Sequence, residues 1–316
     1  MEPIGTTAPR ARPSTTIHDH HQMPTTPRRR SPVVGHLLAG SALLVVAAGA
    51  LGAHDTWLIA NAGSVPVNGI VTLDMSSGGK FPRNELAILP ARVAQRALHV
   101  AGTSVPLAAP MAVPRALRFR TKVPQEGVAL FSVSLHPKVL TLAPNLVKEY
   151  VDEIGAAPEF FTRWQSAPGQ AWVERYSKHA KAFVRVGAAS ARDSGWARPT
   201  GQPYELVPQQ NPTALVAGDS LSVLVLRCGR PLADVAVGTE RGGSGHAGMA
   251  RTNASGIATV HLARAGRWMV NSTYLAYADR VGPLCEAALP GDTVRVGYVS
   301  QFATMTFDVA ATPRGR

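Results

Sequence analysis

The segment Gly127-Val-Ala-Leu-Phe-Ser-Val-Ser-Leu135 is the clearest indication of how this chain folds. Apolar side chains occupy every second position from 129 to 135, and Ser132, Ser134 and His136 alternate with them. A period of two places the apolar residues on one face of an extended strand and the polar residues on the other. The segment therefore predicts a half-buried β-strand.

Similar short segments lie on both sides of it, separated by turns. The chain has 29 glycines and 25 prolines among 316 residues, and only 16% of its residues are charged. This composition favours many short strands over long helices. The other segments predicted as strands are TWLIA (56–60), GIVTLDMSS (69–77), RALHVAG (96–102), ALRFRTKV (116–123), SLSVLVLRC (220–228), DVAVGT (234–239), IATVHLA (257–263), RWMVNSTYL (267–275) and QFATMTFDV (301–309).

Between these two β regions the spacing of apolar residues becomes helical. Apolar residues recur at helical intervals from Leu146 to Ile154, with Pro144 near the start and Gly155 at the end. A second helical stretch is predicted from positions i, i+4, i+7 and i+11, occupied by Trp172, Tyr176, His179 and Phe183.

We therefore predict an all-β protein with two β-sandwich domains joined by a short helical connector. The predicted limits are a leader over 1–53, an N-terminal sandwich over 54–138, the connector over 139–187, a linker over 188–204 and a C-terminal sandwich over 205–312.

The leader has the pattern of an export signal. Arg28-Arg-Arg30 precedes residues 33–53, which carry no formal charge and end in small residues. Cleavage after Ala53 would make His54 the first residue, and cleavage after Ala50 would leave three more. A retained membrane anchor over 33–53 is the alternative, and Met23 is an alternative start. We expect a periplasmic or secreted protein, soluble after cleavage.

Export predicts an oxidising compartment, and the chain contains only two cysteines, Cys228 and Cys285. The sequence is compatible with a bridge between them and also with two separate buried thiols. The formal charge is +12, but lysines and arginines are scattered after His54, which argues against a nucleic-acid partner.

Several common motifs are excluded by their context. Gly243 to Gly248 matches G-x-G-x-x-G, but another predicted strand follows it instead of a helix, so we interpret it as a hairpin tip. The sequence has no H-E-x-x-H and no C-x-x-C. His179 is interpreted as a core histidine.

A metal site at the mature N-terminus is the remaining hypothesis. As first residue, His54 would offer its α-amine and imidazole together, a pair suited to Cu, Ni or Co. His99 and His136 lie in the same predicted domain and are the expected partner ligands, and Asp55 is either a ligand or an orienting residue. The alternative is that His54 merely begins the first strand.

The order of several motifs resembles a bacterial family of exported proteins of unknown function that has been associated with the periplasmic side of nickel/cobalt uptake (NikM-like). The motifs are HDTWL (54–58), GKFP (79–82), ILPAR (88–92), ERYSKHAK (174–181), PYELVP (203–208), NP (211–212), GRPL (229–232) and FATMTF (302–307). The block from Glu174 to Lys178 is the most specific, and we interpret it as a structural clamp between the β regions. The second half also resembles prealbumin-like sandwiches. Where members are expected to carry a late His and a late Trp, this chain has Tyr274 and Phe302.

The resemblance implies an exported, non-catalytic metal-binding or metal-uptake accessory protein. Its expected partner is a membrane metal-uptake system or an outer-membrane receptor. One alternative is a recognition module that binds a polymer or a partner protein without metal. The other is a copper oxidase with a histidine brace at the N-terminal amine.

Overall fold

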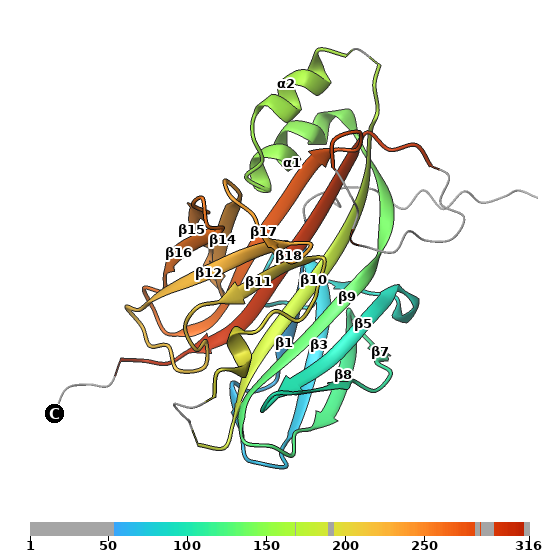
Figure 1. The fold of residues 1–316 in the computed structure, drawn as a ribbon. Helices are drawn as coiled ribbons and strands as arrows, with labels where there is room; N and C mark the ends of the chain where they lie inside the picture. The colour runs from blue at the N-terminus through green and yellow to red at the C-terminus, as the bar shows by residue number, and fades with distance from the viewer. Residues whose placement is uncertain (1–53, 168, 189–192, 282–284, 286–293, 313–316) are drawn as a thin grey trace, which may run out of the picture. The chain divides into compact units, whose positions relative to one another are not determined.

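Three β-sheets form most of the computed structural model, which describes residues 54–167, 169–188, 193–281, 285 and 294–312 (Figure 1). The predicted leader lies outside these residues. Sheet A contains β1 (Asp55–Ala60), β3 (Ile70–Gly78), β8 (Ala116–Lys122) and β7 (Met111–Val113) in that order, with β4 (Leu86–Ala87) paired to β3.

Sheet B is the largest, and its strand order mixes both halves of the chain. The order is β15 (Gly245–Arg251), β14 (Ala236–Arg241), β17 (Gly266–Tyr277), β18 (Tyr298–Val309), β10 (Trp172–Val186), β9 (Gly127–Leu142), β5 (Val93–Val100) and β6 (Thr103–Pro106), with β2 (Ser64–Val65) paired to β10. Sheet C contains β11 (Tyr204–Pro208), β12 (Ser220–Arg227) and β13 (Arg230–Pro231), with β16 (Ile257–His261) paired to β12.

Sheets A and C cover opposite faces of sheet B. On β18, Met305 and Phe307 belong to the core shared with sheet C. The alternate residues Thr304 and Thr306 donate hydrogen bonds to main-chain carbonyls of β1 in sheet A. The predicted all-β fold with sandwich packing is therefore confirmed, and the two sandwiches share sheet B as a common layer.

Strand β9 contains the segment from which the β-fold was predicted, and its side chains alternate between the two faces of the sheet as expected. Ala129, Phe131 and Val133 pack in the core beneath sheet A. Ser132 and Ser134 lie on the other face, yet both are buried. Ser132 contacts His99, and Ser134 contacts His179 and Gln202. The strand also continues through Pro137 to Leu142, beyond the predicted end of the first β region.

The helical prediction is correct for one stretch and wrong for the other. The first stretch forms η2 (Pro144–Leu146) and α1 (Val147–Glu153), which α2 (Glu159–Gln165) follows. The second stretch, Trp172 to Phe183, lies in strand β10. This strand is buried on both faces, so its apolar residues do not alternate with polar ones, and a helical spacing arose by coincidence. The two short 3-10 helices elsewhere are η1 (Pro90–Arg92) and η3 (Gly195–Ala197).

A buried polar cluster around Glu174 holds β10 in place. The Glu174 carboxylate accepts hydrogen bonds from Tyr150 Oη at 2.7 Å, from Trp172 Nε1 at 2.8 Å and from Ser300 Oγ. Burial is the main reason why the pKa of Glu174 is raised. These contacts join α1 and β18 to β10, which agrees with a clamp.

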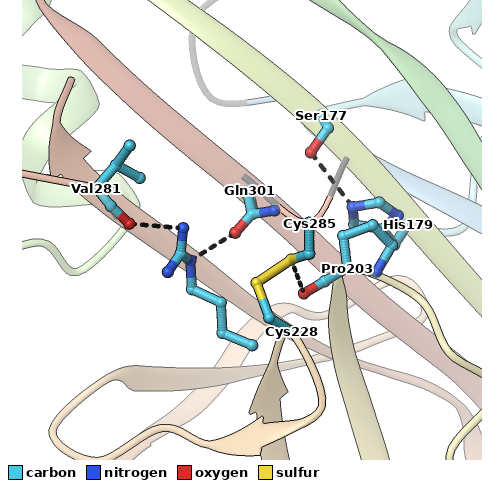
Figure 2. The surroundings of a disulfide bond; sticks show 8 residues. Ser177, His179, Pro203, Cys228, Val281, Cys285 and Gln301 are labelled. Carbon is cyan, nitrogen blue, oxygen red and sulfur yellow. Dashed lines mark hydrogen bonds between the residues drawn. A yellow bond between two sulfur atoms is a disulfide. The ribbon is translucent and has the colours of Figure 1, made fainter. Parts of the chain in front are cut away.

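A disulfide bond links Cys228 and Cys285, so the first of the two alternatives for the cysteines is correct (Figure 2). Beside it, the Arg227 guanidinium donates to Gln301 Oε1 at 2.9 Å and to the Val281 carbonyl at 3.0 Å. The bridge ties the end of β12 in sheet C to the segment between β17 and β18. Within the described residues, the helices are all too short and too polar to span a membrane.

Candidate functional site

The site begins at His54 and Asp55, where the described chain enters β1. Asp55 pairs with Gly78 in sheet A. Its Oδ2 accepts a hydrogen bond from Asn271 Nδ2 on β17, so the carboxylate connects sheet A to sheet B. The His54 carbonyl accepts a hydrogen bond from Lys178 Nζ on β10. Main-chain and side-chain contacts therefore fix the start of the folded chain from two strands of sheet B.

The His54 ring is half-buried beside the turn at Gly79. A Cβ at Gly79 would lie 3.8 Å from His54 Cδ2 and 4.0 Å from Nε2, which are ordinary contact distances, so the imidazole lies close to this turn. The Nδ1 atom is buried and has no hydrogen-bond partner in the described part of the chain. Burial, followed by the positive charge of Lys178, lowers the pKa of His54. The neutral imidazole is the form that ligates metals.

Asp55 lines a cavity of about 410 Å³ together with three other carboxylates, Asp152, Glu153 and Glu240. Glu153 is the last residue of α1, and Glu240 lies near the end of β14. Asn271 and His246 also line this space. We call it the acidic cavity. It brings together residues of sheet A, sheet B and the helical segment.

Three of these carboxylates, those of Asp55, Glu153 and Glu240, interact electrostatically, and the fourth, Asp152, forms a salt bridge with Lys148. Burial, then the charges of Asp55 and Glu153, raise the pKa of Glu240 to about 7. Burial, followed by Asp55 and Glu149, also raises the pKa of Glu153. The pKa of Asp55 is raised by burial, which outweighs the Asn271 hydrogen bond and the charge of Lys178. The cavity therefore carries negative charge that is costly to hold without a positive partner.

Lys178 is a buried cation whose charge acts on Asp55 and Glu153. Its pKa is lowered to about 8, mainly by burial, which outweighs the attraction of Asp55. The Nζ atom lies 5.0 Å from the centre of the Phe302 ring and 5.6 Å from that of Tyr176. The ammonium group is thus held beneath His54 by its carbonyl and by two aromatic rings.

The structure does not bring His99 and His136 to His54. His99 Nε2 lies 2.9 Å from Ser132 Oγ on the face of sheet B opposite to sheet A. Burial, followed by Lys181, lowers its pKa. His136 lies on β9, and its carbonyl accepts a hydrogen bond from Arg92 Nη2 at 2.8 Å. Among the described residues, no group of three or more His, Cys, Asp or Glu side chains is arranged to hold a metal ion.

His179 is a buried core histidine, as predicted, although on a strand. Its Nδ1 lies 3.1 Å from Ser134 Oγ, and its Nε2 lies 3.2 Å from Ser177 Oγ. The predicted hairpin tip is also correct, since β14 and β15 pair antiparallel across it.

Comparison with known proteins gives a family but no activity. A family model described as a domain of unknown function, DUF4198, matches residues 51–276. No curated protein matches the chain.

Two solved structures show weak similarity to this chain. The mouse nectin-like molecule 4 ectodomain is 11% identical with a TM-score of 0.18, over 84% of this chain and 67% of that one. The Yersinia pseudotuberculosis adhesin InvE is 12% identical with a TM-score of 0.20, over 83% of this chain and 61% of that one. Scores this low do not establish a shared fold or function.

Proposed function

The chain belongs to the DUF4198 family, a domain of unknown function, and we propose that it is an exported, non-catalytic protein that binds a transition-metal ion in the acidic cavity as an accessory component of metal uptake. The observation that carries the proposal is the cavity lined by Asp55, Glu153 and Glu240, whose lining residue Gly79 lies close to the His54 ring.

Electrostatics favour a cation in this space. Asp55, Glu153 and Glu240 each have a raised pKa, and the charge of Asp55 contributes to the shift at both Glu153 and Glu240. A divalent ion would replace this mutual repulsion by attraction in a partly buried setting. Because metal ligands must be deprotonated, binding would release protons and strengthen as the pH rises through 7.

His54 would add nitrogen donors to the carboxylate oxygens of a cavity that His246 also lines. Its imidazole is half-buried with a lowered pKa, and its Nδ1 has no hydrogen-bond partner in the described residues. After cleavage behind Ala53, its α-amine would add a second nitrogen. Mixed nitrogen and oxygen ligands suit nickel, cobalt and copper better than magnesium or calcium.

The carboxylates do not converge closely enough to hold an ion by themselves. The cavity volume of about 410 Å³ leaves room for water molecules that complete the coordination sphere. Such a site would exchange its ion readily. Reversible binding suits delivery to a membrane uptake system or an outer-membrane receptor, which are the partners we propose.

The disulfide supports export to the periplasm or beyond. Bridges such as Cys228–Cys285 persist in oxidising compartments and are rare in the cytosol. N-terminal sequencing of the protein recovered from the periplasm tests the export proposal, and His54 is the expected first residue.

Calorimetric titration of Ni²⁺, Co²⁺ and Cu²⁺ tests the binding proposal. The wild-type protein beginning at His54 is compared with His54→Ala, Asp55→Asn and Glu240→Gln, and with the exposed control Glu159→Gln. We expect each of the first three changes to weaken binding by at least about tenfold, or ~1.4 kcal/mol, and the control to have no effect. Equal affinities in all five proteins would overturn the proposal and leave a recognition module that binds no metal.

One additional protein separates the two nitrogen donors. Adding a single alanine before His54 keeps the imidazole but moves the free amine away from it. A further loss of copper affinity in this protein would assign the α-amine as a ligand. Unchanged affinity would restrict the site to side chains.

A further inference from the structure

A second cavity, of about 570 Å³, lies on the other side of the β14–β15 hairpin. Four basic residues line it: Arg241, His246, His261 and Arg264. None of the described residues that line it is Asp or Glu. We call it the basic cavity. It opens between the edges of sheets B and C, where β15 and β16 are the outer strands.

The alternation of β14 separates the two cavities. Glu240 lines the acidic cavity, while its neighbours Thr239 and Arg241 line the basic one. Side chains of successive strand residues point to opposite faces, so one hairpin can form a wall of both spaces. His246, at the start of β15, is the residue with a charge-bearing side chain common to both linings.

The arginines of the basic cavity have no acidic partners among the residues that the structure describes. Arg241 Nη2 donates a hydrogen bond to Ser244 Oγ. Its guanidinium lies beside Gly266, where an added Cβ atom would be 3.6 Å from Nη1. The Arg264 carbonyl accepts a hydrogen bond from Trp268 Nε1 at 2.9 Å, which fixes the turn that carries this side chain. Within the described residues, neither guanidinium makes a salt bridge.

Neighbouring arginines that lie outside the cavity are neutralised. Arg267 Nε lies 2.8 Å from Asp308 Oδ1, and Arg251 Nε lies 2.8 Å from Asp234 Oδ1. Of these four arginines, the two outside the cavity form salt bridges. The two that form none within the described residues, Arg241 and Arg264, line the cavity, where an external anion can reach them.

We propose that the basic cavity binds a small molecule that carries at least two anionic oxygen groups, carboxylate or phosphate. Planar guanidinium groups match the geometry of both groups through paired N–H donors. The histidines and the hydroxyls of Ser244 and Thr259 supply further donors along the wall. A volume of about 570 Å³ falls within the range of small-molecule sites. This inference is independent of metal binding.

Calorimetric titration of the metal-free protein with citrate and, separately, with inorganic phosphate tests it. The wild type is compared with Arg241→Gln, Arg264→Gln and the control Arg120→Gln, an exposed arginine on β8 in sheet A that loses the same charge. We expect saturable binding of at least one probe, weakened about fivefold or more by each cavity substitution and unaffected by the control. Tighter binding of citrate would identify a carboxylate ligand, and tighter binding of phosphate a phosphorylated one.

Two results would overturn the proposal. One is the absence of saturable binding for both probes. The other is an equal loss of affinity in the control, which would show that only net charge matters. Far-ultraviolet circular dichroism of each variant checks that it is folded. Either failure leaves the metal proposal intact, because that titration uses substitutions in the acidic cavity.

Discussion

Asn271 donates a hydrogen bond to Asp55 across a sequence separation of 216 residues. The contact joins the first strand of sheet A to β17 of sheet B at the wall of the acidic cavity. It also limits how far burial raises the pKa of Asp55. This one bond therefore serves both the packing of the layers and the charge state of the proposed site.

Replacing Asn271 by alanine removes that donor. We expect Asn271→Ala to lower the free energy of unfolding by about 1–3 kcal/mol, because the Asp55 carboxylate would remain partly buried with one hydrogen bond fewer. Urea denaturation at pH 7 measures the change. The exposed substitution Gln95→Ala is the control and should stay within about 0.5 kcal/mol of wild type. An equally small effect at Asn271 would show that the contact is energetically unimportant.

Glu240 predicts an unusual dependence of stability on pH. Its pKa in the folded protein is about 7, above the ordinary value of 4.5. The native state therefore binds the proton more tightly, so stability falls as the pH rises from about 4.5 through 7. Glu240→Gln should be more stable than wild type by about 1 kcal/mol at pH 8, since the side chain is only partly buried.

The difference between Glu240→Gln and wild type should vanish at pH 4, where both side chains are neutral. Denaturation of the metal-free proteins at both pH values checks this. A constant difference at the two pH values would contradict the assigned pKa.

The Lys181–Glu205 pair is the most deeply buried ion pair among the described residues. Lys181 Nζ lies 2.6 Å from Glu205 Oε1, with 2% and 1% of the side chains exposed. Lys181→Met or Glu205→Leu alone should cost about 3–5 kcal/mol, because each leaves an unpaired buried charge. The double substitution should cost less than the sum of the two by at least about 1 kcal/mol. Strict additivity in a double-mutant cycle would show that the two charges are not coupled.

The disulfide should make a large contribution to stability. Its cysteines are separated by 57 residues, which corresponds to about 4 kcal/mol on the chain-entropy model. Reduction of the wild type should lower its midpoint of thermal unfolding, and Cys228→Ala/Cys285→Ala should unfold at that lower temperature with or without reductant. A reductant effect that persists in the double variant would point to a cause other than the bridge.

Local patterns predicted the strands well where one face is apolar and the other polar. The β9 segment is such a case, and its alternating apolar residues do form the core beneath sheet A. Strand β10 lacks this contrast. Trp172 is in the core with α1, Phe183 is in the core with sheet C, and Ala182 is in the core with sheet A. A strand buried on both faces shows no period of two. The apolar residues of β10 happen to recur at helical intervals, so the sequence pattern predicts a helix where a strand forms.

The sequence predicted only some of the residues of the candidate site. His54 and Asp55 stood out because polar residues follow an uncharged leader. Glu153 and Glu240 gave no such signal, since one ends a short helix and the other lies near the end of a short strand. Their meeting with Asp55 depends on the tertiary packing, because residues of β14, β17 and α1 line one cavity with the first residue of β1. The sequence predicts His99 as a partner ligand of His54 because both lie in the first β region. In the structure its side chain lies on the face of sheet B opposite to sheet A.

Anomalous X-ray diffraction from crystals grown with nickel at pH 8 tests the central claim most directly. We predict a nickel peak inside the acidic cavity, within coordination distance of a carboxylate oxygen of Asp55, Glu153 or Glu240. A nitrogen of His54 should complete the protein ligands. A fully soaked crystal with no peak in that cavity, or with its strongest peak at His99 or His136, would contradict the account.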